Sequence, residues 1–261
     1  MPELPDVAVF GGYFDETALD QTIDAVDADA GVLEGVSAAQ LTHALVGQSF
    51  SASRRHGKYL FVPVSSGHWL ILHFGMTGYL KYFKGIDEKP PHVRMRIDFT
   101  NGCHLAFDCL RKLGRIRLRS DAAEFIREVK LGPDALSGDL TAEAFKQRLS
   151  GGRGYVKTAL MNQSIIAGIG NIYSDEILYH ARLHPKRKVG GLADAEFDRL
   201  YRRMHSVFNQ AISANADADR MPDDFLLKKR DATATCSFCG GAIEKITISG
   251  RNGYCCPRCQ V

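Results

Sequence analysis

Four of the seven cysteines stand in two close pairs at the C-terminal end of the chain. Cys236 and Cys239 form the first pair and Cys256 and Cys259 the second, so the spacing is C-x2-C-x16-C-x2-C. Each pair can supply two thiolates to a tetrahedral zinc ion, and the intervening segment is long enough for a β-hairpin. A unit this small buries too little apolar surface to fold alone. The spacing therefore predicts a zinc-stabilised domain over residues 232–261.

The alternative reading of these pairs is two disulfide bonds, which a reducing cytosol disfavours. Cys255 is left out of the ligand set because its neighbour Cys256 gives the correct spacing. Cys103 and Cys109 are expected to be ordinary buried thiols. Between the pairs, EKITIS and GYCC predict the two strands, and the Asn252–Gly253 dipeptide predicts the tight turn that joins them.

Residues 20–120 follow mostly a period of two, which indicates β-strands. RMRIDF (94–99) and RIRLR (115–119) alternate apolar and charged residues, and KYLFVPV (58–64) and WLILHF (69–74) predict more buried strands. A sheet or sandwich is expected, with one helix that begins after Ser37 and ends at Gly47.

Residues 133–215 follow a helical period instead. The clearest helix is expected to begin at an N-cap residue, Asp194. It carries one apolar stripe, which consists of Phe197, Leu200, Met204, Val207, Phe208 and Ala211. Residues 214–235 are interpreted as a connector. The fold class that follows is α+β, with an N-terminal β-sandwich and a C-terminal helical lobe.

The charge is unevenly distributed. The first 53 residues contain no Lys or Arg and nine acidic residues, while residues 54–261 hold 33 basic and 21 acidic ones. This balance favours a polyanionic partner, although charges spread over solvated faces would give the same composition. The longest apolar run, Trp69 to Phe74, is too short to span a bilayer, and no apolar segment follows the acidic N-terminus. A cytosolic protein is expected.

The segment VKTALMNQSIIAGIGNIYSDEILYHARLHP (156–185) predicts helix, tight turn and helix. Gly168 and Gly170 lie in the turn, and Asn171 lies at the start of the second helix. Backbone N–H groups at a helix start can bind a phosphate, and Lys157 could reach the same anion. The alternative is a packing turn that needs glycine for its backbone angles.

The N-terminus reads MPELPDV. Removal of the initiator methionine would give Pro2 a free secondary amine, next to the carboxyl group of Glu3. The alternative is an ordinary start in which Pro5 begins a helix.

These motifs occur together in a known order. MPELP, RRHGKYL, LHFGMTG, GIGNIYSDE and a final zinc hairpin with GR and CPRCQ span the whole chain. The sequence resembles the formamidopyrimidine-DNA glycosylase/endonuclease VIII family of bacterial base-excision repair enzymes, and GKYL and FGMTG resemble the formamidopyrimidine branch more closely. The resemblance implies a catalytic β-sandwich domain (1–130), a helix-two-turn-helix DNA-binding domain (131–231) and a four-cysteine zinc finger (232–261).

The resemblance also implies an activity. A bifunctional DNA glycosylase/AP lyase would excise oxidised bases, among them formamidopyrimidines, hydantoins and 8-oxoguanine, and would cleave the abasic site by β,δ-elimination. Its partner would be damaged double-stranded DNA, its form a monomer, and its location the bacterial cytosol and nucleoid. One structural zinc ion is the implied cofactor.

The implied catalytic residues lie at the N-terminus. Pro2 would be the nucleophile, since an α-amine is far less protonated at neutral pH than a lysine and attack by a secondary amine gives an iminium ion directly. Glu3 would be the catalytic acid. Lys58 would contact a phosphate beside the lesion, and Lys157 would lie near the damaged nucleotide.

The remaining implied residues bind DNA. His73, Asn171 and Arg251 would grip phosphates and hold the nucleotide outside the helix, because its C1′ cannot be reached within a stacked duplex. Met76 and Arg111 would fill the space that the nucleotide leaves.

The sequence departs from the family pattern at three places. Asp6 replaces a glutamate, Leu113 replaces the phenylalanine of a wedge, and the connector 214–235 is short for a lesion-capping loop. Slow removal of 8-oxoguanine is therefore expected. The alternatives are an endonuclease VIII-like preference for oxidised pyrimidines, a non-catalytic zinc-stabilised DNA-binding protein and, more weakly supported, an RNA-binding zinc-ribbon protein.

Overall fold

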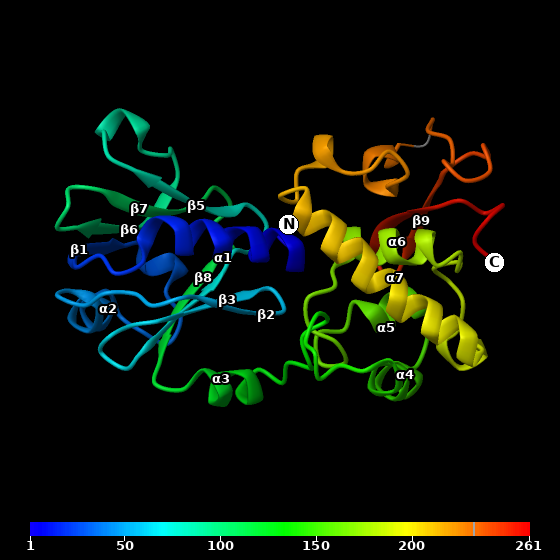
Figure 1. Cartoon of the computed structure of the whole chain (residues 1–261), viewed down its shortest axis with the longest axis horizontal. Helices are drawn as coiled ribbons and strands as arrows, with labels where there is room; N and C mark the ends of the chain where they lie inside the picture. Colours follow the sequence, from blue (N-terminus) through cyan, green and yellow to red (C-terminus); the bar gives the residue numbers. More distant parts are fainter. Residues whose placement is uncertain (232) are drawn as a thin grey trace. The chain divides into compact units, whose positions relative to one another are not determined.

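The computed structural model describes residues 1–231 and 233–261, and for Ile86 it describes only the backbone. Ala232, where one expected domain boundary falls, is outside the described residues. Contacts divide the chain into two compact units, drawn in Figure 1: unit 1 holds residues 1–2 and 6–129, and unit 2 holds residues 3–5 and 130–261. The expected separation of residues 131–231 from 232–261 stays a prediction.

Unit 1 is built on two antiparallel four-stranded sheets (Figure 1). The first has the strand order β1-β6-β7-β5, and the second has the order β2-β3-β4-β8. The bounds of the strands are β1 Ile23–Ala28, β2 Arg54–His56, β3 Tyr59–Pro63, β4 Trp69–His73, β5 Gly78–Phe83, β6 Val93–Phe99, β7 His104–Cys109 and β8 Arg115–Arg119.

One apolar core joins the two sheets. It takes Leu60 and Leu72 from the second sheet and Ile97 and Phe107 from the first, and helix α1 (Leu4–Ala18) contributes Phe14. The expected β-sandwich is confirmed. Helix α2 (Ala38–Leu45) begins after Ser37, as predicted, because the Ser37 hydroxyl accepts the Gln40 N–H while the Gln40 side chain accepts the Ser37 N–H.

The alternation predicted for β6 is confirmed, since Met95, Ile97 and Phe99 are all buried. In β8 one arginine departs from the predicted exposed face. Arg117 is only 7 % exposed, because its guanidinium stacks over the Phe125 ring of helix α3 (Ala122–Glu128). A period of two identifies the face of a sheet, but it cannot show that a helix covers that face.

Unit 2 consists of short helices, one long helix and a hairpin (Figure 1). The helix bounds are α4 Ala142–Ser150, α5 Val156–Leu160, α6 Asn171–His180 and α7 Asp194–Ser213. Short 3-10 turns occur in this unit at Val189–Gly191, Ala218–Arg220 and Leu226–Lys229, and in unit 1 at Ala30–Val32 and Ile86–Glu88. The apolar stripe predicted for α7 is buried throughout.

The predicted cap of α7 is wrong by one residue. Asp194 is the first helical residue, and the N-cap position belongs to Ala193, which has no capping oxygen. Glu196 compensates, because its Oε2 accepts the Ala193 N–H at 2.8 Å and the Arg187 guanidinium at 3.1 Å.

The hairpin consists of β9 (Glu244–Ile248) and β10 (Arg251–Cys255). The turn predicted at Asn252–Gly253 is wrong, because Asn252 is paired with Thr247 inside the ladder. Ser249 and Gly250 form the turn instead, with φ of 49° and 75°. Gly253 is needed for a different reason, since a Cβ there would lie 2.8 Å from the carboxylate of Asp175.

A small core anchors the hairpin within unit 2. It contains Tyr179 of α6, Leu226, Ile243 and two of the paired cysteines. Among the described residues, no helix has both the length and the apolar character that crossing a membrane requires.

Candidate active site

The carboxyl group of Glu3 is buried at the N-terminus of α6. Its Oε2 accepts the N–H of Gly170 at 2.7 Å and of Tyr173 at 3.2 Å, and its Oε1 accepts the N–H of Ile172 at 2.8 Å. The first N–H groups of a helix have no partner within the helix, and they carry the positive end of its dipole. The carboxyl group therefore has a fixed position, directly next to Pro2 in the chain.

Two glycines of the predicted turn make room for this arrangement. A Cβ on Gly170 would lie 2.2 Å from Glu3 Cδ, and one on Gly168 would lie 2.6 Å from Leu4 Cδ1. Gly168 also has a φ of +114°, and its carbonyl accepts the Leu4 N–H at 3.1 Å. Both glycines therefore serve the close approach of residues 3 and 4.

The expectation that the backbone at this helix start grips a phosphate is wrong for these N–H groups. Gly170, Ile172 and Tyr173 donate to Glu3, a residue of the same chain. The sequence could not show this pairing, because the two partners are more than 160 residues apart.

Pro2 is half-buried and lies immediately before Glu3, while Met1 is exposed. Its nitrogen is part of an amide as long as Met1 remains and becomes a secondary amine after Met1 is removed. A free amine and a carboxyl group would then be neighbours in the chain, which is the combination that covalent catalysis with acid assistance needs.

Asn171 and Lys157 meet the hairpin at the same helix start. The Asn171 amide donates to the Asn252 carbonyl at 2.9 Å, and Lys157 Nζ donates to the Asn171 carbonyl at 3.1 Å. Lys157 also forms a short ion pair with Asp175, and its side chain is 1 % exposed. Burial lowers the pKa of the Lys157 ammonium, and the Asp175 charge opposes this shift.

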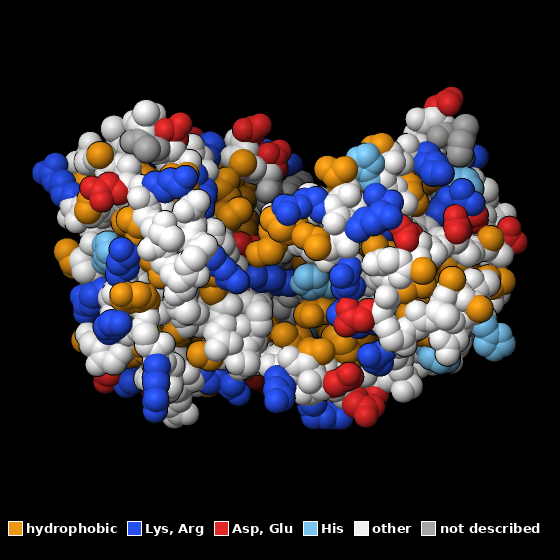
Figure 2. Space-filling view, turned by 180° about the vertical axis from the view of Figure 1, so that it is seen from behind, with side chains coloured by type: hydrophobic (Ala, Val, Ile, Leu, Met, Phe, Trp, Pro, Cys, Tyr) orange, Lys and Arg blue, Asp and Glu red, His pale blue; other side chains and the backbone are white. Residues whose placement is uncertain are grey.

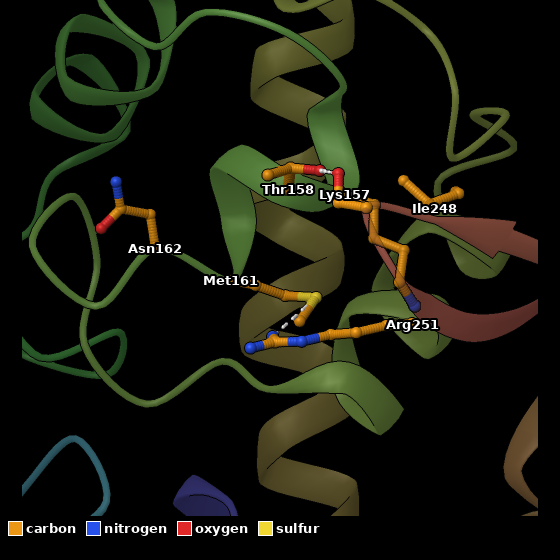
Figure 3. A pocket seen from close by; sticks show the side chains of 7 residues that line it. Lys157, Thr158, Met161, Asn162, Ile248 and Arg251 are labelled. Atoms are coloured by element: carbon orange, nitrogen blue, oxygen red, sulfur yellow. Dashed lines mark hydrogen bonds between the residues drawn. The ribbon is translucent and has the colours of Figure 1, made fainter.

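Arg251 borders a cavity of about 310 Å³ between the α5 segment and the hairpin. Figure 3 shows its side chain extended beneath Met161, whose sulfur lies 3.9 Å from Arg251 Nη1. Lys157, Thr158, Asn162, Ile248 and Ser249 line the same cavity. Arg251 is the first residue of β10 and follows the turn directly, so its guanidinium is exposed at the rim of the cavity.

In unit 1, Lys58 lies in the turn between β2 and β3, and His73 ends β4. Burial, and then the charges of Arg117, Lys58 and Arg115, lower the pKa of His73 to about 4. The ring is therefore neutral at pH 7. Its Nδ1 accepts the Gly75 N–H at 3.3 Å, which leaves the proton on Nε2 as a hydrogen-bond donor.

Met76 and Arg111 lie in two loops, one between β4 and β5 and the other between β7 and β8. Met76 is 39 % exposed, Leu113 is 43 % exposed and Leu110 is 56 % exposed. The loops touch, because a Cβ on Gly75 would lie 2.4 Å from the Leu113 carbonyl carbon. Leu110 was not among the predicted site residues. The signal for it in the sequence is an apolar residue placed directly after the strand β7, at the start of a loop.

The four predicted cysteines come together, and Cys255 does not join them. One ligand atom from each residue lies within 4.8 Å of the others. The Sγ–Sγ distances include 3.5 Å for Cys236–Cys259 and 3.6 Å for Cys239–Cys256. These distances are too long for a disulfide, and they fit the separation of about 3.8 Å that tetrahedral Zn–S bonds of about 2.3 Å require. The cluster can therefore hold one metal ion.

The surroundings of Cys236 favour a thiolate, the form that binds metal. Burial raises the pKa of this thiol, but donation from the Tyr179 hydroxyl at 3.2 Å and from the Phe238 N–H at 3.4 Å outweighs it. Together these contacts lower the pKa of Cys236 to about 6.

On the face shown in Figure 2, the positive charge indicated by composition is not gathered in one place. In Figure 2, Lys and Arg side chains are spread over the face that is shown, with acidic side chains between them.

Two family models match the chain. The Formamidopyrimidine-DNA glycosylase N-terminal domain matches residues 1–116, and the Formamidopyrimidine-DNA glycosylase H2TH domain matches residues 131–222. The chain is 35 % identical to a formamidopyrimidine-DNA glycosylase from Pelotomaculum thermopropionicum over 79 % of both sequences. It is 32 % identical to the one from Geobacter metallireducens over the full length of both.

Solved structures of related proteins agree. A complex of Lactococcus lactis Fpg with DNA that contains an abasic site matches with a TM-score of 0.90, at 26 % identity over 99 % of both chains. A structure of MutM with DNA that contains carbocyclic 8-oxo-G matches with a TM-score of 0.88, at 26 % identity and the same coverage.

The domain matches cover most of the chain, the relative from Geobacter metallireducens aligns with it from end to end, and the glycine turn and the cysteine cluster are in place. The chain belongs to the formamidopyrimidine-DNA glycosylase family of DNA-repair enzymes, DNA glycosylases with an associated lyase activity.

Proposed function

We propose that this protein excises oxidised bases from duplex DNA through a Schiff base on Pro2 and then cleaves the abasic strand by β,δ-elimination. The observation that carries the proposal is the buried carboxyl group of Glu3, held by the N–H groups of Gly170, Ile172 and Tyr173 next to the N-terminal proline. An ordinary start of a chain has no need for a buried carboxyl group with three backbone donors.

The chemistry follows from the amine. After Met1 is removed, the lone pair of the Pro2 nitrogen attacks C1′ of the sugar, and the bond to the damaged base breaks. The departing base takes the bonding electron pair and a proton from water. The carboxyl group of Glu3 gives a proton to the ring oxygen of the sugar, the Pro2 nitrogen loses its own proton, the bond between C1′ and the ring oxygen breaks, and an iminium ion forms. Its positive charge acidifies the C2′ hydrogen, so elimination expels the phosphate on C3′. A second elimination expels the phosphate on C5′, and water releases the enzyme.

The partner is double-stranded damaged DNA, bound by a monomer. The related structures contain DNA with an abasic site or an 8-oxo-G analogue, which supports this assignment. Lys58, His73, Asn171 and Arg251 contact phosphates in this proposal. His73 does so as a neutral donor, because its low pKa keeps the ring uncharged at pH 7. A bacterial cytosolic location follows from the substrate.

Met76 and Arg111 fill the space that the extruded nucleotide leaves. Both belong to the touching loops of unit 1, and the exposure of Met76 supports the role. Leu113 adds an apolar side chain to this surface but offers no ring to stack on the opposite base.

The four-cysteine cluster holds one structural zinc ion in this proposal. Cys236, Cys239, Cys256 and Cys259 are the ligands, and the Sγ–Sγ distances support tetrahedral coordination. When bound, the ion supplies no chemistry to the reaction, and it stabilises the hairpin that presents Arg251.

Two alternatives lead to different results. A preference like that of endonuclease VIII would favour oxidised pyrimidines, and a non-catalytic DNA-binding protein would bind without covalent chemistry. The retention of both Pro2 and Glu3, with Glu3 buried and held, favours the catalytic proposal.

Borohydride should trap the protein covalently on DNA that contains an abasic site, because it reduces the iminium ion to a stable amine. A variant with an uncleaved N-terminal extension should not be trapped, since its Pro2 nitrogen is an amide. The same protein after removal of the extension is the control. Undiminished trapping by the extended protein, with its N-terminus verified by mass spectrometry, would exclude Pro2 as the nucleophile.

Gly170→Ala should lower the single-turnover rate of base excision by about 100-fold or more, since displacing a catalytic group by an ångström has effects of this size. The new Cβ would lie 2.2 Å from the Glu3 carboxyl carbon and would displace the carboxyl group. Gly190→Ala is the matched control, because a Cβ there meets nothing within 4 Å. Equal rates for the two variants would show that the position of Glu3 is unimportant for the reaction.

Elemental analysis should find one zinc ion per chain. Cys239→Ser should have a larger effect on DNA binding than on the thermal stability of unit 1. The cysteine cluster lies within unit 2, whereas the sandwich core lies within unit 1. Cys103→Ser, outside the cluster, is the control. Full DNA affinity in zinc-free protein would refute a structural role for the metal.

The lesion ranking should place formamidopyrimidines and hydantoins above 8-oxoguanine, with abasic-site nicking retained. Poorly stacked lesions need less energy for extrusion, and Leu113 and the short connector 214–235 offer little to compensate for a well-stacked base. Single-turnover rates on duplexes with each lesion opposite cytosine measure this. Equal release of 8-oxoguanine would contradict the reasoning from the short connector, and faster release of oxidised pyrimidines would favour the endonuclease VIII alternative.

A further inference from the structure

We infer that Asp175 is a positioning residue that fixes the strand carrying the phosphate-binding residue Arg251, and that Lys157 acts through Asp175 and does not itself contact DNA. The inference rests on the proposed function and deepens it, since it assigns a role to a buried charge cluster that the reaction does not use. Asp175, Lys157 and Arg230 form this cluster, and all three belong to unit 2.

The Asp175 carboxylate collects donors from three separate segments. It accepts the Lys157 ammonium from α5, the Arg230 guanidinium at 2.8 Å and the Tyr254 N–H of β10 at 3.2 Å. Its side chain is fully buried. One carboxylate on α6 therefore holds α5, the end of the connector and the hairpin together.

The hairpin is held at close range. Gly253 lies against the cluster, because a Cβ there would be 2.8 Å from Asp175 Oδ1 and 3.0 Å from Lys157 Nζ. The neighbouring Asn252 carbonyl accepts the Asn171 amide at 2.9 Å. Arg251 directly precedes Asn252 in the same strand. The contacts that fix residues 252–254 therefore also fix the backbone position from which the Arg251 side chain extends.

Lys157 is unsuited to a direct phosphate contact. Its side chain is 1 % exposed, and its ammonium donates to Asp175 and to the Asn171 carbonyl. A contact with DNA would have to break a buried ion pair and leave the Asp175 carboxylate with less compensation, which is strongly unfavourable. Arg251, by contrast, is exposed at the rim of the neighbouring cavity (Figure 3).

The two roles can be separated with a double-mutant cycle on DNA affinity. The probe is a labelled duplex with a tetrahydrofuran abasic analogue, measured by fluorescence anisotropy over a range of salt concentrations. The variants are Asp175→Asn, Lys157→Met and Arg251→Ala, together with each of the first two combined with Arg251→Ala. Zinc content and circular dichroism verify that each variant is folded.

Asp175→Asn and Lys157→Met should each weaken binding by about tenfold and reduce the salt slope by about one phosphate, as Arg251→Ala does. In the Arg251→Ala background, neither should weaken binding by more than about twofold, because the contact they support is already absent. A general loss of stability would not reproduce this change of salt slope. Asp223→Asn, which breaks an exposed ion pair with Lys228 at 2.9 Å, is the control and should leave affinity unchanged.

An equal loss for Lys157→Met in both backgrounds would show that Lys157 touches DNA itself and would overturn the inference. If Asp175→Asn does not fold, the cycle with Lys157→Met decides the question alone, since it leaves Arg230 and the Tyr254 N–H on the carboxylate. If borohydride traps the wild-type protein and the effects of the substitutions on DNA affinity are additive, only this inference is refuted. Wild-type protein that does not bind the duplex refutes the proposed function as well.

Discussion

The contact between the Glu3 carboxyl group and the start of α6 is the interaction on which the candidate site depends. It satisfies three N–H groups that a helix leaves without partners, and it holds a carboxyl group at a defined point. A glycine turn makes it possible, because side chains at residues 168 and 170 would collide with Leu4 and Glu3. The most distinctive motif of unit 2 thus exists to receive the first residues of the chain.

Helix α6 continues this organisation after its first turn. Asp175 holds the hairpin strand β10, and Glu176 accepts the N–H groups of Leu226 and Leu227 at 2.8 and 2.7 Å. Both acids are buried, so each must be paired to be tolerated. The start of α6 and its two acids, Asp175 and Glu176, can therefore fix residue 3, the connector and the cysteine-bearing hairpin at once. Loss of any one of them would leave a buried charge or orphaned backbone donors, which is more costly than loss of an apolar contact.

Features that depend on local spacing could be predicted from the sequence. The cysteine cluster, the apolar stripe of α7 and the Ser37 cap follow from fixed periods and short-range geometry. Features that depend on distant partners could not. Asn252–Gly253 has the composition of a turn, but Gly253 is needed where the strand passes Asp175. Lys157 is of a residue type that often binds phosphate, but in the structure its ammonium is paired with Asp175, which lies 18 residues further along the chain.

The loops of unit 1 that carry Met76 and Leu113 show the same difference between sequence and structure, and here it bears on lesion specificity. Leu113 replaces a ring by a branched aliphatic side chain, and from the sequence this is only a loss of stacking surface. In the structure Leu110 is exposed in the same loop, and Met76 is exposed in the loop that touches it. Exposed side chains of this size are unfavourable in water, and aliphatic wedges can separate base steps without stacking on them. In the proposed reaction, the surface that these loops present to the extruded nucleotide would therefore stay apolar and lose its preference for a flat partner. It would discriminate among lesions by how readily they leave the helix, because it would do little to hold the opposite base in place.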